Sequence, residues 1–153
     1  MANVNDVADF FLSKEPMSQK KLQKLVYYAY AWTLALLNDS EESIKYRLFD
    51  SEIQAWVHGP VCPLLYQEYK RYGWEDIEKI EFYDEDIFQG DILDILNQVW
   101  DVYGKYTGNQ LEGFTHQEDP WIAARGGIPS YASCDTPIDD RVIFKYYNEQ
   151  AAE

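Results

Sequence analysis

The sequence offers little sulfur or imidazole chemistry. Its 153 residues include two cysteines, Cys62 and Cys134, and two histidines, His58 and His116. Two cysteines cannot supply the disulfide framework of a small secreted domain. We therefore expect both to be reduced thiols in a cytoplasmic protein, with a single disulfide as the alternative.

Long apolar runs and cofactor motifs are also missing. No run approaches the roughly 20 apolar residues of a transmembrane helix, and the first six residues lack the basic and apolar regions of a signal peptide. There is no P-loop, no dinucleotide-binding glycine fingerprint, no Cys-x-x-Cys and no His-Glu-x-x-His. We expect no membrane span, no cofactor and no metal.

Positive charge is scarce in the second half of the chain. Residues 1–73 contain nine acidic and eight basic residues, whereas residues 74–153 contain eighteen acidic and five basic ones, giving net charges of −1 and −13. Nucleic-acid binding depends on Lys and Arg contacts to phosphate, so that function is not expected. An acidic half suits a basic protein partner, although it also serves solubility alone.

Aromatic residues are abundant, at 16% of the chain, and the length is that of one domain. Apolar residues recur at helical spacing along most of the sequence. The pattern predicts a mainly α (α+β) fold: a compact single domain, 1–153, of six to seven helices with a small β-hairpin or sheet near residues 48–58.

The predicted helices begin and end at recognisable capping residues. Their ranges are 4–12, 18–38, 63–73, 87–106, 107–115, 121–125 and 137–148. The second helix is apolar on most of its circumference and is expected at the centre of the fold. A short strand is expected at 79–83, and Ile138, Val142 and Tyr146 are expected to point inward from the last helix.

Two short signatures contain both histidines. The first runs Trp56-Val57-His58-Gly59-Pro60-Val61, with Gly59-Pro60 expected to end the strand. The second runs Thr115-His116-Gln117-Glu118-Asp119-Pro120-Trp121, followed by Arg125. Each residue fits a structural role: a stiffened turn, a core ring, or a charge at a helix N-terminus. A metal site, a Cys–His nucleophile, or a small hydrolase using His58, His116 and Glu118 remain alternatives.

Together with Lys21-Leu22-Gln23-Lys24-Leu25-Val26-Tyr27-Tyr28 and Phe49-Asp50-Ser51-Glu52, these signatures resemble the Panacea-domain, or SocA-like, antitoxins, many of them phage-associated. The resemblance covers residues 17–125. Its signature positions here are Lys24, Tyr27, Tyr28, Trp56, His58, Gly59, Pro60, His116, Glu118, Pro120, Trp121 and Arg125.

This resemblance implies a non-enzymatic antitoxin that silences a cognate protein toxin by direct binding, and the acidic half of the chain suits a basic toxin. The alternative in the same family is an adaptor that delivers its toxin to a protease. The toxin is expected to meet the face around His58-Gly59-Pro60 and the start of the Lys20–Tyr28 helix, with acidic residues between Glu75 and Asp94 at the rim, because exposed loops and aromatic anchors, here including Tyr28, dominate recognition.

Overall fold

The computed structural model describes residues 1–152, and it confirms the mainly α class with a small hairpin. The helices of this part of the chain are α1 (Val4–Leu12), α2 (Gln19–Leu37), α3 (Pro63–Tyr69), α4 (Gly90–Tyr103), α5 (Gly108–Thr115), α6 (Asp119–Arg125) and α7 (Asp140–Ala151). The strands are β1 (Gln54–Trp56) and β2 (Gly59–Val61), and short 3-10 turns, η1 and η2, occupy Lys70–Tyr72 and Glu85–Ile87.

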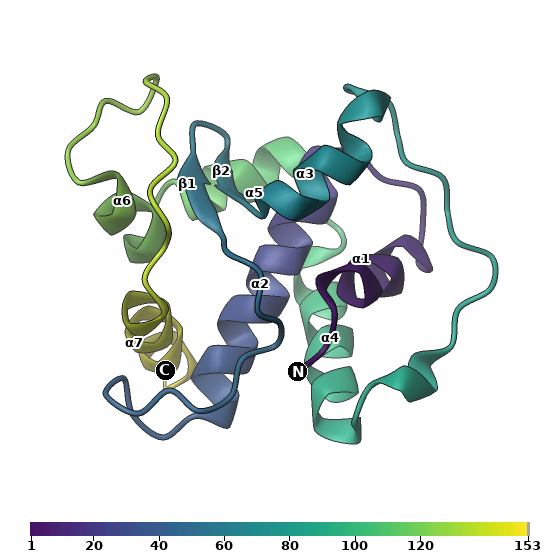
Figure 1. Cartoon of the computed structure of the whole chain (residues 1–153), viewed down its shortest axis with the longest axis horizontal. Coiled ribbons are helices and arrows are strands. Elements are labelled where there is room, and N and C mark those ends of the chain that lie inside the picture. The colour runs from purple at the N-terminus through teal and green to yellow at the C-terminus, as the bar shows by residue number, and fades with distance from the viewer. Residues whose placement is uncertain (153) are drawn as a thin grey trace.

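Helix α2 is the centre of the molecule, as its apolar circumference predicts. It packs against α1, α3, α4, α5, α7 and β2, and Figure 1 shows it crossing the middle with α7 on one side and α1 and α4 on the other. Ser18 caps its N-terminus, because the hydroxyl accepts a hydrogen bond from Lys21 N. Even Lys24, in its second turn, is only 1% exposed.

The hairpin extends further along the chain than expected. Gly59 and Pro60 were predicted to end the strand, but they belong to β2, whose Gly59 and Pro60 lie opposite Trp56 and Ala55 of β1. Val57 and His58 form the two-residue turn between the strands. Gly59 has φ 103°, a conformation that glycine adopts without a steric cost.

The segment before α7 pairs with the outer edge of β1 instead of starting a helix. Ala55 N donates to Thr136 O at 2.9 Å, and Ile138 N donates to Ile53 O at 2.9 Å. This segment pairs with main-chain groups of Ala55 in β1 and of Ile53 just before it, on the side away from β2. Helix α7 therefore begins at Asp140, capped by Asp139, rather than at residue 137.

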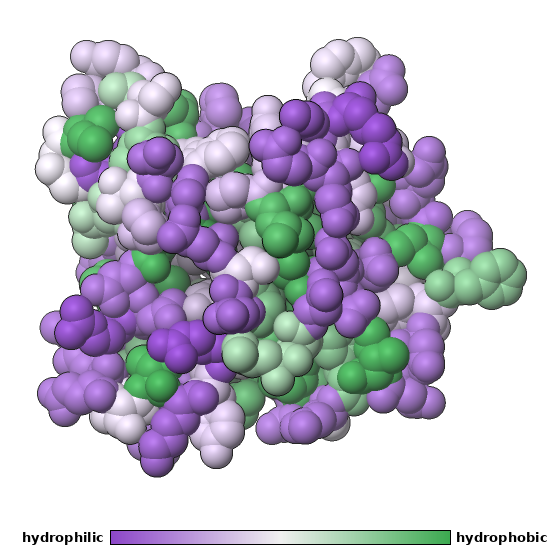
Figure 2. Space-filling model, viewed as in Figure 1, coloured by the Kyte–Doolittle hydropathy of each residue, from purple (hydrophilic) through white to green (hydrophobic). Residues whose placement is uncertain are grey.

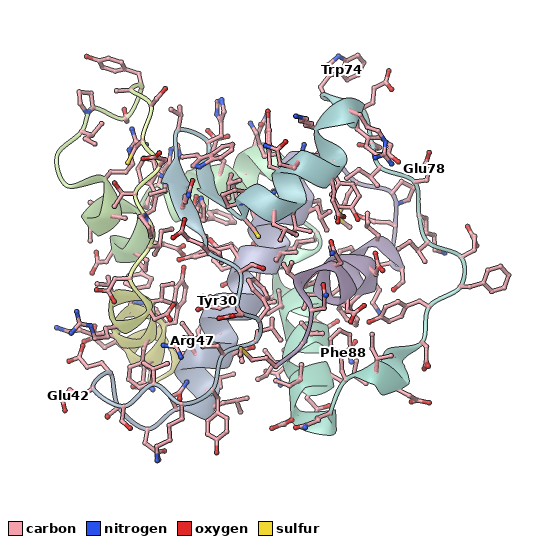
Figure 3. All side chains as sticks on the ribbon, in the orientation of Figure 1. Tyr30, Glu42, Arg47, Trp74, Glu78 and Phe88 are labelled. Carbon is pink, nitrogen blue, oxygen red and sulfur yellow. The ribbon has the colours of Figure 1, made fainter. Side chains whose placement is uncertain are left out.

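The inward face of α7 also differs from the prediction. Ile143, Phe144 and Tyr147 are buried, whereas Val142 and Tyr146 are half-buried. Only Ile138 of the expected stripe is buried, and it precedes the helix. Asp140 fastens the N-terminus of α7 to α2 and the following loop by accepting hydrogen bonds from Tyr30 Oη and Arg47 Nε, each at 2.7 Å (Figure 3).

Residues 73–89 form an irregular connection rather than the predicted strand at 79–83; within residues 1–152, β1 and β2 are the only strands. Ile77 makes an isolated bridge with Met17 and is buried, as is Phe88 near the other end, whereas Trp74 projects into solvent (Figure 3). The helix expected from residue 87 starts only at Gly90, because residues 85–87 form the 3-10 turn.

Hydrophilic residues dominate the face in Figure 2, with apolar patches scattered between them. Of the helices between residues 1 and 152, none has the length and apolar character needed to cross a membrane.

Candidate functional site

Folding brings both histidines to one carboxylate, but this carboxylate is Glu112 rather than the expected Glu118. His58 Nδ1 lies 3.2 Å from Glu112 Oε2, and His116 Nε2 lies 4.0 Å from the same oxygen. Lys20 Nζ lies 2.7 Å from Glu112 Oε1. We call these four residues the Glu112 cluster; it joins α2, α5 and the hairpin turn.

The charges of the Glu112 cluster stabilise one another. Burial opposes ionisation of Glu112, but hydrogen bonds and charge from Lys20 and His58 outweigh it and hold the Glu112 pKa below its usual value. Burial lowers the pKa of His116 despite the nearby Glu112 carboxylate. The His116 ring also stacks on Trp121, with centroids 4.1 Å apart, so its orientation is fixed by packing.

Side chains of the second signature and of Arg125 brace β1 by donating hydrogen bonds to its main-chain carbonyls. Trp121 Nε1 donates to Trp56 O at 2.7 Å, and Arg125 Nη1 donates to Ala55 O at 3.0 Å. Arg125 is 3% exposed; its other terminal nitrogen donates to Pro129 O, and its guanidinium lies over the Trp121 ring. This short helix therefore pins the hairpin to the body of the protein.

Lys24 and Gly59 fit together tightly beneath the hairpin. Lys24 Nζ donates to Pro60 O at 2.9 Å, and burial lowers the Lys24 pKa to about 7. A Cβ on Gly59 would lie 2.7 Å from Lys24 Cε and 2.8 Å from Thr115 Oγ1. One residue earlier, Gln23 exchanges two hydrogen bonds with the backbone of Cys62, a contact that no pattern in the sequence indicates.

Glu118 belongs to a separate, aromatic cluster between α2, α6 and α7. Its Oε1 accepts hydrogen bonds from Tyr28 Oη at 2.9 Å and from Tyr147 Oη at 2.8 Å. The Tyr147 hydroxyl also lies 3.1 Å from that of Tyr27, and the Tyr28 ring stacks on Tyr103. Burial raises the Glu118 pKa to about 7, although the two tyrosine hydrogen bonds oppose that rise.

Sequence reasoning missed Tyr147 and Tyr103 as partners of the signature tyrosines. Both lie in helices whose apolar spacing was recognised, so the periodic pattern identified their elements but not their contacts. Because the inward face of α7 was predicted wrongly, Tyr147 was not recognised as a core residue, although it is only 1% exposed.

Both cysteines are free thiols, as predicted. Cys62 is buried, and burial raises its pKa, whereas the Cys134 thiol donates to Thr136 Oγ1. Among residues 1–152, no group of three or more His, Cys, Asp or Glu side chains is placed to hold a metal ion. The chemistry that the arrangement offers is therefore that of the imidazole–carboxylate contact at Glu112.

Few signature residues reach the surface. The His58 side chain is 67% exposed. Tyr28, which was expected to contact a toxin, has no exposed surface, and Gly59 and Pro60 are buried as well. Tyr28 therefore cannot anchor a partner in the folded chain; its ring and hydroxyl are committed to Tyr103 and Glu118.

Comparison with known protein families identifies a match over most of the chain. The model of the family described as "Antitoxin SocA-like, Panacea domain" matches residues 22–122, about two thirds of the chain. The matched segment runs from the first turn of α2 into α6, so it contains the hairpin, Glu118 and every member of the Glu112 cluster except Lys20. No curated protein and no solved structure shows significant similarity to the chain.

Proposed function

Because this chain belongs to the Panacea-domain family of SocA-like antitoxins, we propose that it neutralises a cognate protein toxin by binding it directly. The family match over residues 22–122 is the observation that carries this proposal. The toxin itself is defined here only by its chemistry, as a protein that an acidic surface would attract.

The charge distribution supports a basic protein as the partner and argues against nucleic acid. Thirteen of the fourteen net negative charges fall in residues 74–153. Such a field speeds encounter with a positively charged protein and repels phosphate. Much of this charge lies in the irregular connection and in α4, outside the hairpin framework.

We further propose that the protein is not an enzyme and that the Glu112 cluster is structural. The Glu112 carboxylate contacts Lys20 of α2 and His58 of the hairpin turn. These contacts suit an ion-pair network that holds the hairpin turn against α2. One observation favours the hydrolase alternative: two histidines approach a single carboxylate, and one of them is exposed. His58→Ala distinguishes a structural role of the cluster from a hydrolase role. A structural role leaves toxin neutralisation intact apart from a modest loss of stability, whereas a catalytic role for His58 predicts that neutralisation is lost.

Expression of the adjacent gene tests the proposed function. The product of that gene, expressed alone, should arrest growth, and co-expression of this chain should restore it. The two purified proteins should form a complex by size-exclusion chromatography. Growth arrest that co-expression does not relieve, or the absence of a complex, would contradict direct neutralisation.

The proteolytic-adaptor alternative predicts a different fate for the toxin. The toxin's half-life after inhibition of protein synthesis would be shorter when this chain is present, whereas direct neutralisation leaves it unchanged or longer. A complex that persists with a long-lived toxin supports simple sequestration.

A further inference from the structure

An apolar groove of about 260 Å³ opens where α2, α4 and the last turn of α7 meet. It is lined by Trp32, Leu36, Ile95, Gln98, Val99, Val102, Tyr103 and Ala151. Leu36 and Val102 are aliphatic, yet they are 47% and 54% exposed. The core therefore leaves apolar surface uncovered at a place where three helices already form a concave wall.

The floor of the groove is rigid. Trp32 Nε1 donates to Tyr103 Oη at 3.0 Å, and the Tyr103 ring stacks on buried Tyr28 at 4.0 Å. A preorganised floor reduces the ordering cost of binding. The volume is below the roughly 300–1,000 Å³ of small-molecule sites, so the groove suits apolar side chains inserted from another protein.

The rim of the groove is acidic on the side of α4. This helix carries Asp91, Asp94 and Asp101 and no Lys or Arg. Asp94 precedes Gln98 by four residues and Asp101 follows it by three, so both lie beside Gln98 at the edge of the helix face that lines the groove. Both are exposed, and seven residues along a helix separate them by about 10.5 Å.

We propose that this groove, which we call the α2/α4 groove, receives a basic amphipathic helix of the toxin. Its apolar residues would insert between Leu36 and Val102, while Lys or Arg residues two turns apart would meet Asp94 and Asp101. Recognition of this kind combines a helix laid in an apolar groove with complementary charge at the rim. The inference rests on the proposed function, because it names the surface by which the toxin is held.

Two variants with a matched control test this surface. Asp94→Lys/Asp101→Lys reverses the rim charge, and Val102→Asp places a charge in the groove. The control, Glu42→Lys/Asp135→Lys, makes the same change in net charge on exposed acidic residues outside the groove; Glu42 lies on the loop after α2 (Figure 3). The probe is the purified product of the adjacent gene, and circular dichroism establishes that each variant is folded.

Titration calorimetry should show that each groove variant raises the Kd at least tenfold, whereas the control raises it less than threefold. Groove variants that bind like the wild type, or a control that weakens binding equally, would overturn the groove as the binding surface. A wild-type chain that does not bind the probe would instead refute the proposed function. Sedimentation of the chain alone tests a second copy as occupant: a dimer that Val102→Asp dissociates would also overturn the assignment.

Discussion

Replacing Gly59 by alanine tests how the hairpin is fitted to the body of the protein. Gly59 has φ 103°, and its missing Cβ would meet Lys24 Cε at 2.7 Å and Thr115 Oγ1 at 2.8 Å. Lys24 cannot move aside freely, because its side chain is buried and its Nζ donates to Pro60 O. The alanine therefore strains the backbone and also displaces a buried hydrogen bond.

The two costs can be estimated separately. A positive φ costs an alanine about 1–2 kcal/mol. Forcing one extra carbon into a packed site costs about 1–3 kcal/mol. We expect Gly59→Ala to lower the free energy of unfolding by about 3 kcal/mol, which for a chain of this size lowers Tm by roughly 6–12 °C.

Gly126→Ala is the matched control. Gly126 also has positive φ, at 54°, but the nearest atom to its added Cβ is Ala123 O at 3.9 Å, an ordinary contact. Gly126→Ala should therefore lower the free energy of unfolding only by the cost of the backbone conformation, about 1 kcal/mol. Urea unfolding followed by tryptophan fluorescence measures both variants. Equal losses for the two would refute the argument that Lys24 and Thr115 exclude a side chain at Gly59.

Two further changes address the buried polar groups. The Glu118 pKa is raised to about 7 from its ordinary 4.5, so the folded chain holds a proton that the unfolded chain releases, and stability falls as pH rises between these values. Glu118→Gln should remove that decline, so the free energy of unfolding of the variant relative to the wild type should rise by up to about 3 kcal/mol from pH 4 to pH 8. Urea titrations at both pH values measure this difference, and the same pH dependence in variant and wild type would contradict the prediction. Arg125→Lys should lower the free energy of unfolding by about 2–3 kcal/mol, because a single ammonium group cannot reach the separate carbonyls of Ala55 and Pro129. Chemical denaturation measures this loss, and a variant that unfolds at the same denaturant concentration as the wild type would contradict it.

Local patterns predicted most helices correctly because helix ends depend on nearby residues. The Ser18 hydroxyl accepts a hydrogen bond from Lys21 N, and Thr107 forms a capping box with Gln110 at the start of α5. The helix predicted at 121–125 begins two residues earlier, at Asp119, because Glu118 precedes its first turn. Capping needs no knowledge of distant segments.

Errors arose where a partner distant in sequence decides the conformation. Thr136 and Pro137 look like a helix start, yet they run beside β1, which needed hydrogen-bond partners on its outer edge. Residues 79–83 alternate like a strand but have no neighbouring strand to pair with among residues 1–152. A strand requires a partner, and local sequence does not say whether one is present.

The sequence by itself determined the class of fold, the positions of the helices, the free cysteines and the family, because periodicity, caps and ordered motifs are written along the chain. Only the tertiary structure decided which groups meet. In the folded chain both histidines lie near Glu112, and Glu118 accepts a hydrogen bond from Tyr28. Tyr28 is buried, whereas Leu36 and Val102 are exposed beside a groove. Those outcomes depend on how helices distant in sequence pack on α2, and helical spacing predicts where a helix forms but not which neighbours it meets.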